Sequence, residues 1–254
     1  MTMFDLSGRV AVVTGGNGGI GLGMAEGLAT AGAAVVVAAR DKAKSAKAVA
    51  TLKALGADSA FVAFDVADPA SCRDLMQQAV ARFGRLDILV NNAGMSIRKP
   101  PQDYAIAEWR QVLDVNLTGA LACCQAAYPA MRKQGGGKII NIGSMFALFG
   151  AAYAAAYAAS KGGLVQLTKS LAVAWAPDNI QVNAVLPGWI DTELTQNARA
   201  AVPGLHDRVL RRTPAGRWGL PQDLAGVAVF LAAAASDFVT GAAIPVDGGF
   251  AAEF

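Results

Sequence analysis

The chain alternates between short apolar runs and longer segments with helical spacing, and this alternation limits the folds open to it. The short runs are rich in valine, isoleucine and alanine, which is typical of strands buried on both faces. Alternating strands and helices form βαβ units, whose right-handed crossovers place helices on both faces of a parallel sheet. We therefore predict an α/β fold, a doubly wound Rossmann-type parallel sheet of about seven strands with helices on both faces.

The same pattern predicts where each element lies. The predicted strands are Val10–Thr14, Ala34–Ala39, Ala60–Phe64, Ile88–Val90, Lys138–Ile142, Ile180–Leu186 and Ala243–Val246. The predicted helices are Gly19–Thr30, Lys42–Leu55, Ala70–Phe83, Ala107–Met131, Tyr153–Trp175 and Pro221–Ala234. Asp68 suits the cap of the third helix, and Pro69 suits its first turn.

One long irregular stretch interrupts the alternation, at residues 191–220. A loop of that length inside a compact domain is usually functional, so we predict a substrate lid that can hold short helices of its own. The chain shows no internal repeat and no linker. Residues 1–254 are therefore expected to form a single dinucleotide-binding and catalytic domain.

Composition excludes several other classes of protein. Hydrophobic residues make up 54% and charged residues 16%, which argues against disorder. The net charge of +3 is spread along the chain, so no nucleic-acid partner is indicated. The longest apolar runs, at 146–159 and 224–235, fall short of the ~18–20 residues of a membrane span. No signal peptide is apparent, and three cysteines without CxxC spacing suit a reducing compartment, so we expect a cytoplasmic protein.

A glycine-rich segment follows the first predicted strand and opens the first predicted helix. Its sequence is TGGNGGIG, from Thr14 to Gly21. Glycines allow a tight turn and a close approach to a pyrophosphate, and the helix start offers free N–H groups to it. The segment could be a simple turn, but its placement favours dinucleotide binding. The predicted contacts are Thr14, Gly15, Asn17, Gly19, Ile20 and Gly21.

The end of the second predicted strand distinguishes between the two dinucleotides. NAD-binding folds usually place Asp or Glu about 20 residues after the glycines, where it holds the ribose 2′-hydroxyl. This chain has Arg40 there, and a guanidinium suits a 2′-phosphate. We therefore predict NADP(H), with NAD(H) as the alternative if Asp41 binds the ribose and Arg40 is only a solvated charge.

Further candidates for cofactor contacts follow the third and fourth strands. Asp65, followed by Val66, could accept a bond from the adenine amino group, or it could be an ordinary turn residue. Asn92, Ala93 and Gly94 are small or amide residues that allow close approach to the cofactor ribose, although they also suit a simple turn.

Tyr157 and Lys161 are four residues apart in a predicted helix, so they share one face. A free tyrosine has a pKa near 10, and a neighbouring ammonium favours the phenolate, which makes Tyr157 a candidate general acid/base. Ser144 follows the fifth strand and can hydrogen-bond a substrate oxygen. Asn116 lies inside a predicted helix, where Asn is mildly unfavourable, and could hold a water behind Lys161.

With these motifs in place, the sequence resembles the short-chain dehydrogenases/reductases, in their compact one-domain branch, over nearly the whole chain. The resemblance implies a catalytic tetrad of Asn116, Ser144, Tyr157 and Lys161, with Tyr157 and Lys161 also touching the cofactor. It implies a homotetramer with the helices of Asn116 and Tyr157 at one interface. The further cofactor contacts that it implies are Pro187, Gly188, Ile190 and Thr192.

The substrate is the least determined part of the prediction. Segments around residues 214–221 are similar to those of gluconate 5-dehydrogenases, and 3-oxoacyl-carrier-protein reductases share much of the framework. Arg98 could bind a carboxylate or phosphate of a sugar acid, or it could be a solvated loop charge. The alternatives are a 3-oxoacyl thioester, a broad range of ketones, or a redox sensor without turnover. The predicted substrate contacts are Ser96, Arg98, Ser144, Phe146, Tyr153 and Trp189. The only histidine, His206, is expected at the surface of the lid, and no metal site is expected.

Overall fold

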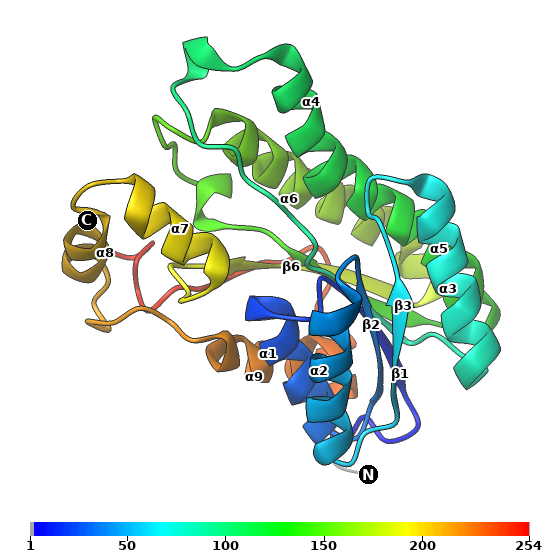
Figure 1. Ribbon diagram of the computed structural model, residues 1–254. Helices are drawn as coiled ribbons and strands as arrows, with labels where there is room; N and C mark the ends of the chain where they lie inside the picture. Colours follow the sequence, from blue (N-terminus) through cyan, green and yellow to red (C-terminus); the bar gives the residue numbers. More distant parts are fainter. Residues whose placement is uncertain (1–2, 254) are drawn as a thin grey trace.

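The computed structural model describes residues 3–253, and its seven-stranded parallel sheet confirms the predicted fold class (Figure 1). The strand order is β3-β2-β1-β4-β5-β6-β7, so the direction of winding reverses between β1 and β4. Parallel sheets bind ligands at such a reversal, outside the carboxyl ends of the strands. The strands are β1 (Val10–Thr14), β2 (Ala34–Ala39), β3 (Ser59–Ala63), β4 (Ile88–Asn91), β5 (Gly137–Ile142), β6 (Ile180–Pro187) and β7 (Ala243–Val246).

Two helical layers cover the sheet, because successive side chains of each buried strand point to opposite faces. Val13 of β1 packs in the layer of α1, α2 and α9, whereas its neighbour Val12 packs in the layer of α3, α5 and α6. Figure 1 shows α1 and α2 on one side of the strands and α3 and α5 on the other. The helices of the two layers are α1 (Gly19–Thr30), α2 (Lys42–Ala54), α9 (Ala225–Ala232), α3 (Pro69–Phe83), α5 (Gly119–Lys133) and α6 (Ala155–Trp175).

The start of α3 agrees with the sequence prediction. The Asp68 carboxylate accepts a hydrogen bond of 2.8 Å from the Ala70 N–H, and Pro69 is the first helical residue. Both features satisfy or remove backbone donors that the first turn of a helix leaves without a partner.

The long helix predicted over Ala107–Met131 is divided into three parts. An α-helix, α4 (Ile106–Leu113), leads into a π-helical turn over Asp114–Thr118, and α5 continues from it. Asn116 lies in this π turn. Single π turns in helices are often found at functional sites, and this one re-aims the Asn116 side chain relative to a regular helix.

Two other predicted helices are shorter than expected. The helix predicted from Tyr153 begins at Ala155, because Ala154 has a non-helical backbone, so Tyr153 lies before α6. The helix predicted over 221–234 consists of a 3₁₀ turn, Pro221–Leu224, followed by α9, which ends where Ala233 becomes extended. Over the described residues, no helix is long and apolar enough to cross a membrane.

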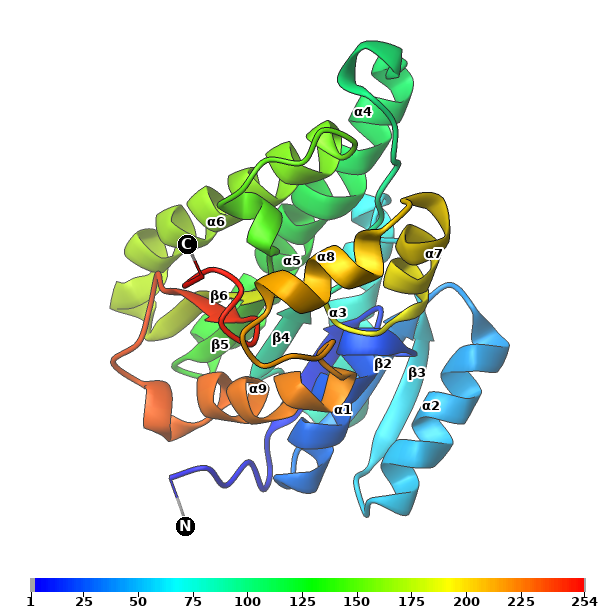
Figure 2. The same cartoon turned by 90° about the vertical axis from the view of Figure 1, so that its left-hand side faces the viewer.

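The stretch 191–220 contains two helices, α7 (Glu193–Ala201) and α8 (Leu205–Arg212). Figure 2 shows both helices above the sheet, near the starts of α1 and α2. Leu205 and Val209 of α8 pack with Ala198 of α7 and with Trp218, so the lid has a small apolar core of its own.

Candidate functional site

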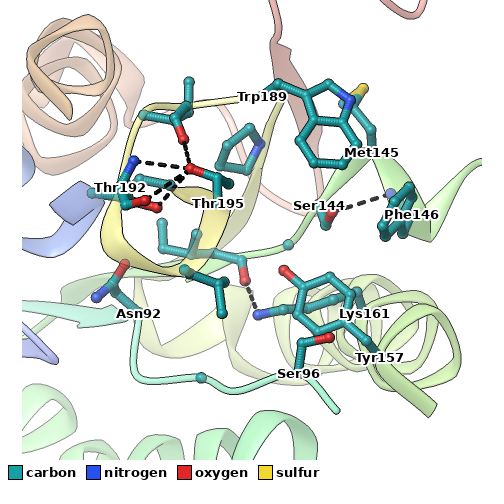
Figure 3. Close-up of a pocket in the computed structure, with 18 of the residues that line it drawn as sticks. Asn92, Ser96, Ser144, Met145, Phe146, Tyr157, Lys161, Trp189, Thr192 and Thr195 are labelled. Atoms are coloured by element: carbon teal, nitrogen blue, oxygen red, sulfur yellow. Dashed lines mark hydrogen bonds between the residues drawn. The ribbon is translucent and has the colours of Figure 1, made fainter. Parts of the chain in front are cut away.

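A pocket opens at the carboxyl ends of β4, β5 and β6, beneath the lid (Figure 3). Its walls come from the segments that follow these strands, from the first turns of α6 and from the start of α7. The predicted site residues that line it are Ile20, Asn92, Gly94, Ser96, Arg98, Ser144, Phe146, Tyr153, Tyr157, Lys161, Pro187, Gly188, Trp189, Ile190 and Thr192. Those that do not line it are Thr14, Gly15, Asn17, Gly19, Gly21, Arg40, Asp65, Val66, Ala93 and Asn116.

Thr14 joins the end of β1 to the segment after β4. Its hydroxyl donates to the Val90 carbonyl at 3.2 Å and accepts from the backbone N–H groups of Asn92 and Ala93, each at 3.0 Å. The Asn92 amide in turn donates to the carbonyls of Thr14 at 3.0 Å and Gly15 at 3.2 Å. These bonds fix the two segments on either side of the point where the sheet winding reverses.

Two positions of the glycine segment require glycine, one for its backbone conformation and one for lack of space. Gly15 has a φ of +64°, a backbone conformation that residues other than glycine rarely adopt. A Cβ on Gly21 would lie 2.4 Å from both the Asn92 Nδ2 and the Gly15 carbonyl oxygen. The turn therefore depends on glycine, as the sequence predicts.

The start of α1 fits an anionic group. No side chain caps this helix, and its first turn carries no acidic residue. Its N-terminal end therefore keeps backbone donors and a positive partial charge that a pyrophosphate can use. Gly18, the residue before the helix, adds no side chain that would block this approach.

The end of β2 favours Arg40 over Asp41 as a cofactor contact. The Asp41 carboxylate caps α2, because it accepts from the Lys44 N–H at 2.9 Å. Arg40 is exposed and follows Ala38 by two residues, and the Ala38 carbonyl accepts from the Gly15 N–H of the glycine segment at 2.8 Å. The Asn17 amide donates to the Ser45 hydroxyl at 3.1 Å, which ties the glycine segment to α2.

Asp65 and Val66 contribute to a turn beside the site. Asp65 accepts from the Ala67 N–H at 3.0 Å, and its own N–H donates to the Ser71 hydroxyl. A Cβ on Gly119 would lie 2.5 Å from the Val66 Cγ2, so this turn packs closely on the start of α5.

Asn116 lies behind the pocket lining and stabilises it through hydrogen bonds. Its amide donates to the Met95 carbonyl at 2.9 Å and to the Ser160 hydroxyl at 3.0 Å, and its oxygen accepts from the Met95 N–H at 2.8 Å. The side chain is 1% exposed. It therefore links the segment after β4 to α6, one residue before Lys161.

Lys161 is buried on the face of α6 that Tyr157 shares. Its ammonium donates to the Ile142 carbonyl at 2.7 Å and lies 5.6 Å from the centre of the Tyr157 ring. Burial lowers the pKa of Lys161 to about 8. A charge without counter-ion is costly in such surroundings, so this group is poised to take up or lose a proton near neutral pH.

Tyr157 and Ser144 lie close together in the pocket, with their hydroxyls turned toward one another (Figure 3). Burial raises the pKa of the Tyr157 phenol, while the Ser144 hydroxyl and the charge of Arg98 oppose this. The direction is opposite to the lowering expected from a nearby ammonium, because the desolvation of the phenol outweighs the charges around it. Tyr157 is therefore protonated at neutral pH.

Aromatic rings form one wall of the pocket. The Phe146 ring lies edge-on to the rings of Tyr153, Tyr157 and Trp189, with centroids 6.5, 6.1 and 5.9 Å apart. The Trp189 ring also contacts Trp218 of the lid, with centroids 5.6 Å apart. The wall thus connects the residues after β5 to the lid.

Arg98 and its neighbour Lys99 point to different places. Arg98 lines the pocket and donates to the Leu194 carbonyl of the lid at 3.2 Å. Lys99 instead pairs with Glu108 at 2.7 Å. Among the described residues that line the pocket, Arg98 and Lys161 are cationic, and there is no carboxylate.

The pocket also includes Ile142 and Gly143, which the sequence prediction missed, and Leu194 and Thr195 of the predicted lid. Thr195 accepts from the Thr192 N–H at 2.9 Å and donates to the Ile190 carbonyl at 2.6 Å, which closes the turn before α7. A Thr three residues after Thr192 is a signal for a capped helix start that could have located this turn.

No cluster of three or more potential metal ligands occurs within residues 3–253. His206 is exposed on α8, as predicted, and its Nδ1 accepts a hydrogen bond of 3.1 Å from the Trp218 indole. The histidine therefore serves the packing of the lid.

Comparison with known proteins agrees with this geometry. A family model described as enoyl-(acyl carrier protein) reductase matches residues 15–251. The chain is 42% identical over 253 residues to 2-dehydro-3-deoxy-D-gluconate 5-dehydrogenase of Dickeya dadantii, covering 99% of each chain. It is 38% identical to gluconate 5-dehydrogenase of Gluconobacter oxydans, covering 97% of this chain and 96% of the relative.

Solved structures show the same fold. A gluconate 5-dehydrogenase from Burkholderia cenocepacia, in complex with NADP and tartrate, superposes with a TM-score of 0.94. It is 42% identical to this chain, and the match covers 99% of this chain and 98% of the other. At 28% identity, levodione reductase also superposes with a TM-score of 0.94.

Proposed function

Because the chain belongs to the short-chain dehydrogenase/reductase family, we propose that it transfers a hydride between NADP(H) and the secondary alcohol or ketone of a sugar acid. It is an NAD(P)-dependent oxidoreductase acting on CH–OH groups. The observation that carries the proposal is the convergence of Ser144, Tyr157 and Lys161 on one pocket beside the glycine segment. The names of two relatives, which refer to gluconate and a dehydro-deoxy-gluconate, support the substrate class.

The residues at the β1 and β2 ends fit NADP(H). The start of α1 accommodates the pyrophosphate, and the exposed Arg40 guanidinium suits the 2′-phosphate. NADP is present in the complex of the Burkholderia cenocepacia relative, which supports the choice of dinucleotide. When bound, the nicotinamide supplies or accepts the hydride.

In the direction of reduction, we propose that Ser144 and Tyr157 hold the substrate carbonyl oxygen. Tyr157 is protonated at neutral pH because burial raises its pKa, so it can donate a proton to the developing alkoxide. Lys161, four residues along the same helix, holds the ribose of the cofactor and favours the phenolate that remains. Oxidation uses the same groups in reverse.

Asn116 acts as a positioning residue in this proposal. Its three hydrogen bonds hold the Met95 segment against Ser160 of α6. A Cβ on Gly94 would lie 3.2 Å from the Asn116 oxygen and 3.7 Å from the Lys161 Nζ, so the amide and the ammonium face the same spot. The amide thereby fixes the distance between the two walls of the pocket.

The charge of the pocket supports an acidic substrate. Arg98 lines the pocket without a lining carboxylate to neutralise it, and a guanidinium binds a carboxylate in a two-pronged geometry. Ser96 also lines the pocket, beside Tyr157 (Figure 3), and its hydroxyl suits a polyhydroxylated chain.

The proposed function can be tested by following NADPH absorbance while keto sugar acids, neutral ketoses and a 3-oxoacyl thioester are added in turn. We expect a kcat/KM for the best keto sugar acid at least ~30-fold above that of the neutral ketose with the same chain, as expected for the loss of one charged contact. Arg98→Met should remove most of this preference, whereas Arg82→Met, on the remote α3, should preserve it. A preference for the thioester would replace the sugar acid with an acyl carrier substrate, and tight NADPH binding without any turnover would favour a sensor.

Arg40→Ala tests the choice of dinucleotide. We expect the Kd for NADPH to rise about 30-fold and the Kd for NADH to change less than about twofold, because only NADPH carries the phosphate that the guanidinium would bind. Fluorescence titration of the purified variant gives both constants. Equal losses for the two dinucleotides would remove Arg40 from the 2′-phosphate site.

We also propose a homotetramer in which α5 and α6 form one interface. The proposal rests on the family to which the chain belongs, and the exposed Val173 of α6 is compatible with it. Light scattering of the purified protein should give a mass about four times that of one chain, whereas a monomer would exclude this assembly. The three buried free thiols suit the cytoplasmic location proposed for it.

A further inference from the structure

Three segments meet beside the start of α1 (Figure 2). They are the glycine segment, the first turn of α2 and the first residue of α7. The Lys44 Nζ of α2 lies 2.9 Å from the Glu193 Oε2 of α7. A Cβ on Gly18 would lie 2.8 Å from the Cε and 3.1 Å from the Nζ of Lys44. The end of the lysine side chain therefore lies over Gly18, the residue that precedes α1.

Two contacts fix the base of the Lys44 side chain. The Lys44 N–H donates to the Asp41 carboxylate at 2.9 Å, which sets the first turn of α2. The neighbouring Ser45 hydroxyl accepts from the Asn17 amide of the glycine segment at 3.1 Å. The backbone from which the lysine projects is thus fixed beside the glycine segment.

The partner of Lys44 is a replaceable anion. The Lys44 and Glu193 side chains are 45% and 78% exposed, and ion pairs so accessible to water contribute little stability. The carboxylate occupies a place where the lysine charge and the uncapped start of α1 both favour negative charge. A phosphate dianion carries more charge and more acceptor oxygens than a carboxylate, so it should displace Glu193.

We propose that Lys44 is a second cation, beside Arg40, for the 2′-phosphate of NADP(H), and that Glu193 occupies it until the dinucleotide binds. Arg40 directly follows β2 and Lys44 lies in the first turn of α2, so the two cations stand four residues apart at the connection between these elements. The inference rests on the proposed function, because it takes NADP(H) as the ligand. Glu193, the first residue of α7, competes with the 2′-phosphate for the Lys44 ammonium.

Fluorescence titration with NADPH and NADH tests the inference on the purified protein and four variants, Lys44→Met, Glu193→Gln, the double variant and the control Lys42→Met. Lys44→Met should raise the Kd for NADPH about tenfold, as for the loss of one exposed charge-assisted contact, with less than about a twofold change for NADH. Glu193→Gln should tighten NADPH binding about threefold, because a weak surface pair no longer competes. This gain should vanish when Lys44 is also replaced. Lys42, an exposed lysine two residues away on the same helix, should be without effect.

The outcomes separate this inference from the function on which it rests. Unchanged NADPH binding in Lys44→Met, equal losses for the two dinucleotides, or an equal loss in Lys42→Met would overturn the role of Lys44. A gain from Glu193→Gln that persists without Lys44 would overturn the competition. If the unaltered protein reduces keto sugar acids with NADPH while any of these occurs, the proposed function stands. Circular dichroism and the melting temperature of each variant show whether the fold is kept.

Discussion

Tyr157→Phe is expected to lower kcat for ketone reduction at least ~10³-fold while the Kd for NADPH changes less than about threefold. The phenol hydroxyl is the only group removed, and the ring keeps its edge-on contact with Phe146, whose centroid lies 6.1 Å away. Without the hydroxyl, the alkoxide that forms on hydride transfer loses its proton donor and one of its two hydrogen bonds. Stopped-flow measurement of NADPH oxidation, paired with fluorescence titration, separates the chemical step from binding.

Tyr153→Phe is the matched control for this substitution. Tyr153 also lines the pocket and also contacts Phe146, but it lies before α6 and has no lysine one helical turn after it. We expect its kcat to stay within about fivefold of the unaltered enzyme, with the larger change in KM. Substantial turnover in Tyr157→Phe, or an equal loss of kcat in Tyr153→Phe, would show that the proton comes from another group.

The sheet could be predicted from the sequence because its strands are short, continuous and apolar. Val10–Thr14 is short, rich in valine and followed by a glycine turn, which favours a strand over a helix, and the structure shows a strand buried along its whole length. The spacing of Tyr157 and Lys161 likewise predicted a shared helix face, and both residues line the same pocket. Signals of this kind depend on neighbours within a few residues, which a sequence displays directly.

Features that depend on contacts between distant segments could not be predicted. The π turn carries Asn116, whose side chain bonds to Met95 and Ser160, 21 and 44 residues away. The pair between Lys44 and Glu193 joins residues 149 positions apart. The raised pKa of Tyr157 follows from burial by the whole pocket, whereas the sequence shows only the lysine one turn along the helix.

Lys161→Met is expected to lower kcat/KM for NADPH about 100-fold. It should also remove the fall in NADPH affinity above about pH 8 that we expect for the unaltered enzyme. Burial places the pKa of Lys161 at about 8 in the folded chain without cofactor. The proposed role requires the ammonium, so NADPH affinity and kcat/KM should both fall as the pH rises above about 8. Titration of the Kd between pH 6 and 10 checks this, with Tyr157→Phe as the control that should keep the break. If the NADPH Kd of Lys161→Met still rises above about pH 8, the titrating group is not Lys161.

The same burial predicts a second effect that needs no cofactor. A lysine whose pKa falls from 10.5 in the unfolded chain to about 8 in the folded one binds more protons when unfolded between these pH values. The free energy of unfolding should therefore rise with pH from about 8 to about 10.5, and the protonated lysine should cost stability at pH 7. Lys161→Met has no such group, so its free energy of unfolding at pH 7 should exceed that of the unaltered protein by up to about 3 kcal/mol. Denaturant unfolding measures this difference, which should narrow toward pH 10. If the variant is less stable at pH 7, the charge of Lys161 is compensated in the folded protein and the proposed pH dependence of binding loses its cause.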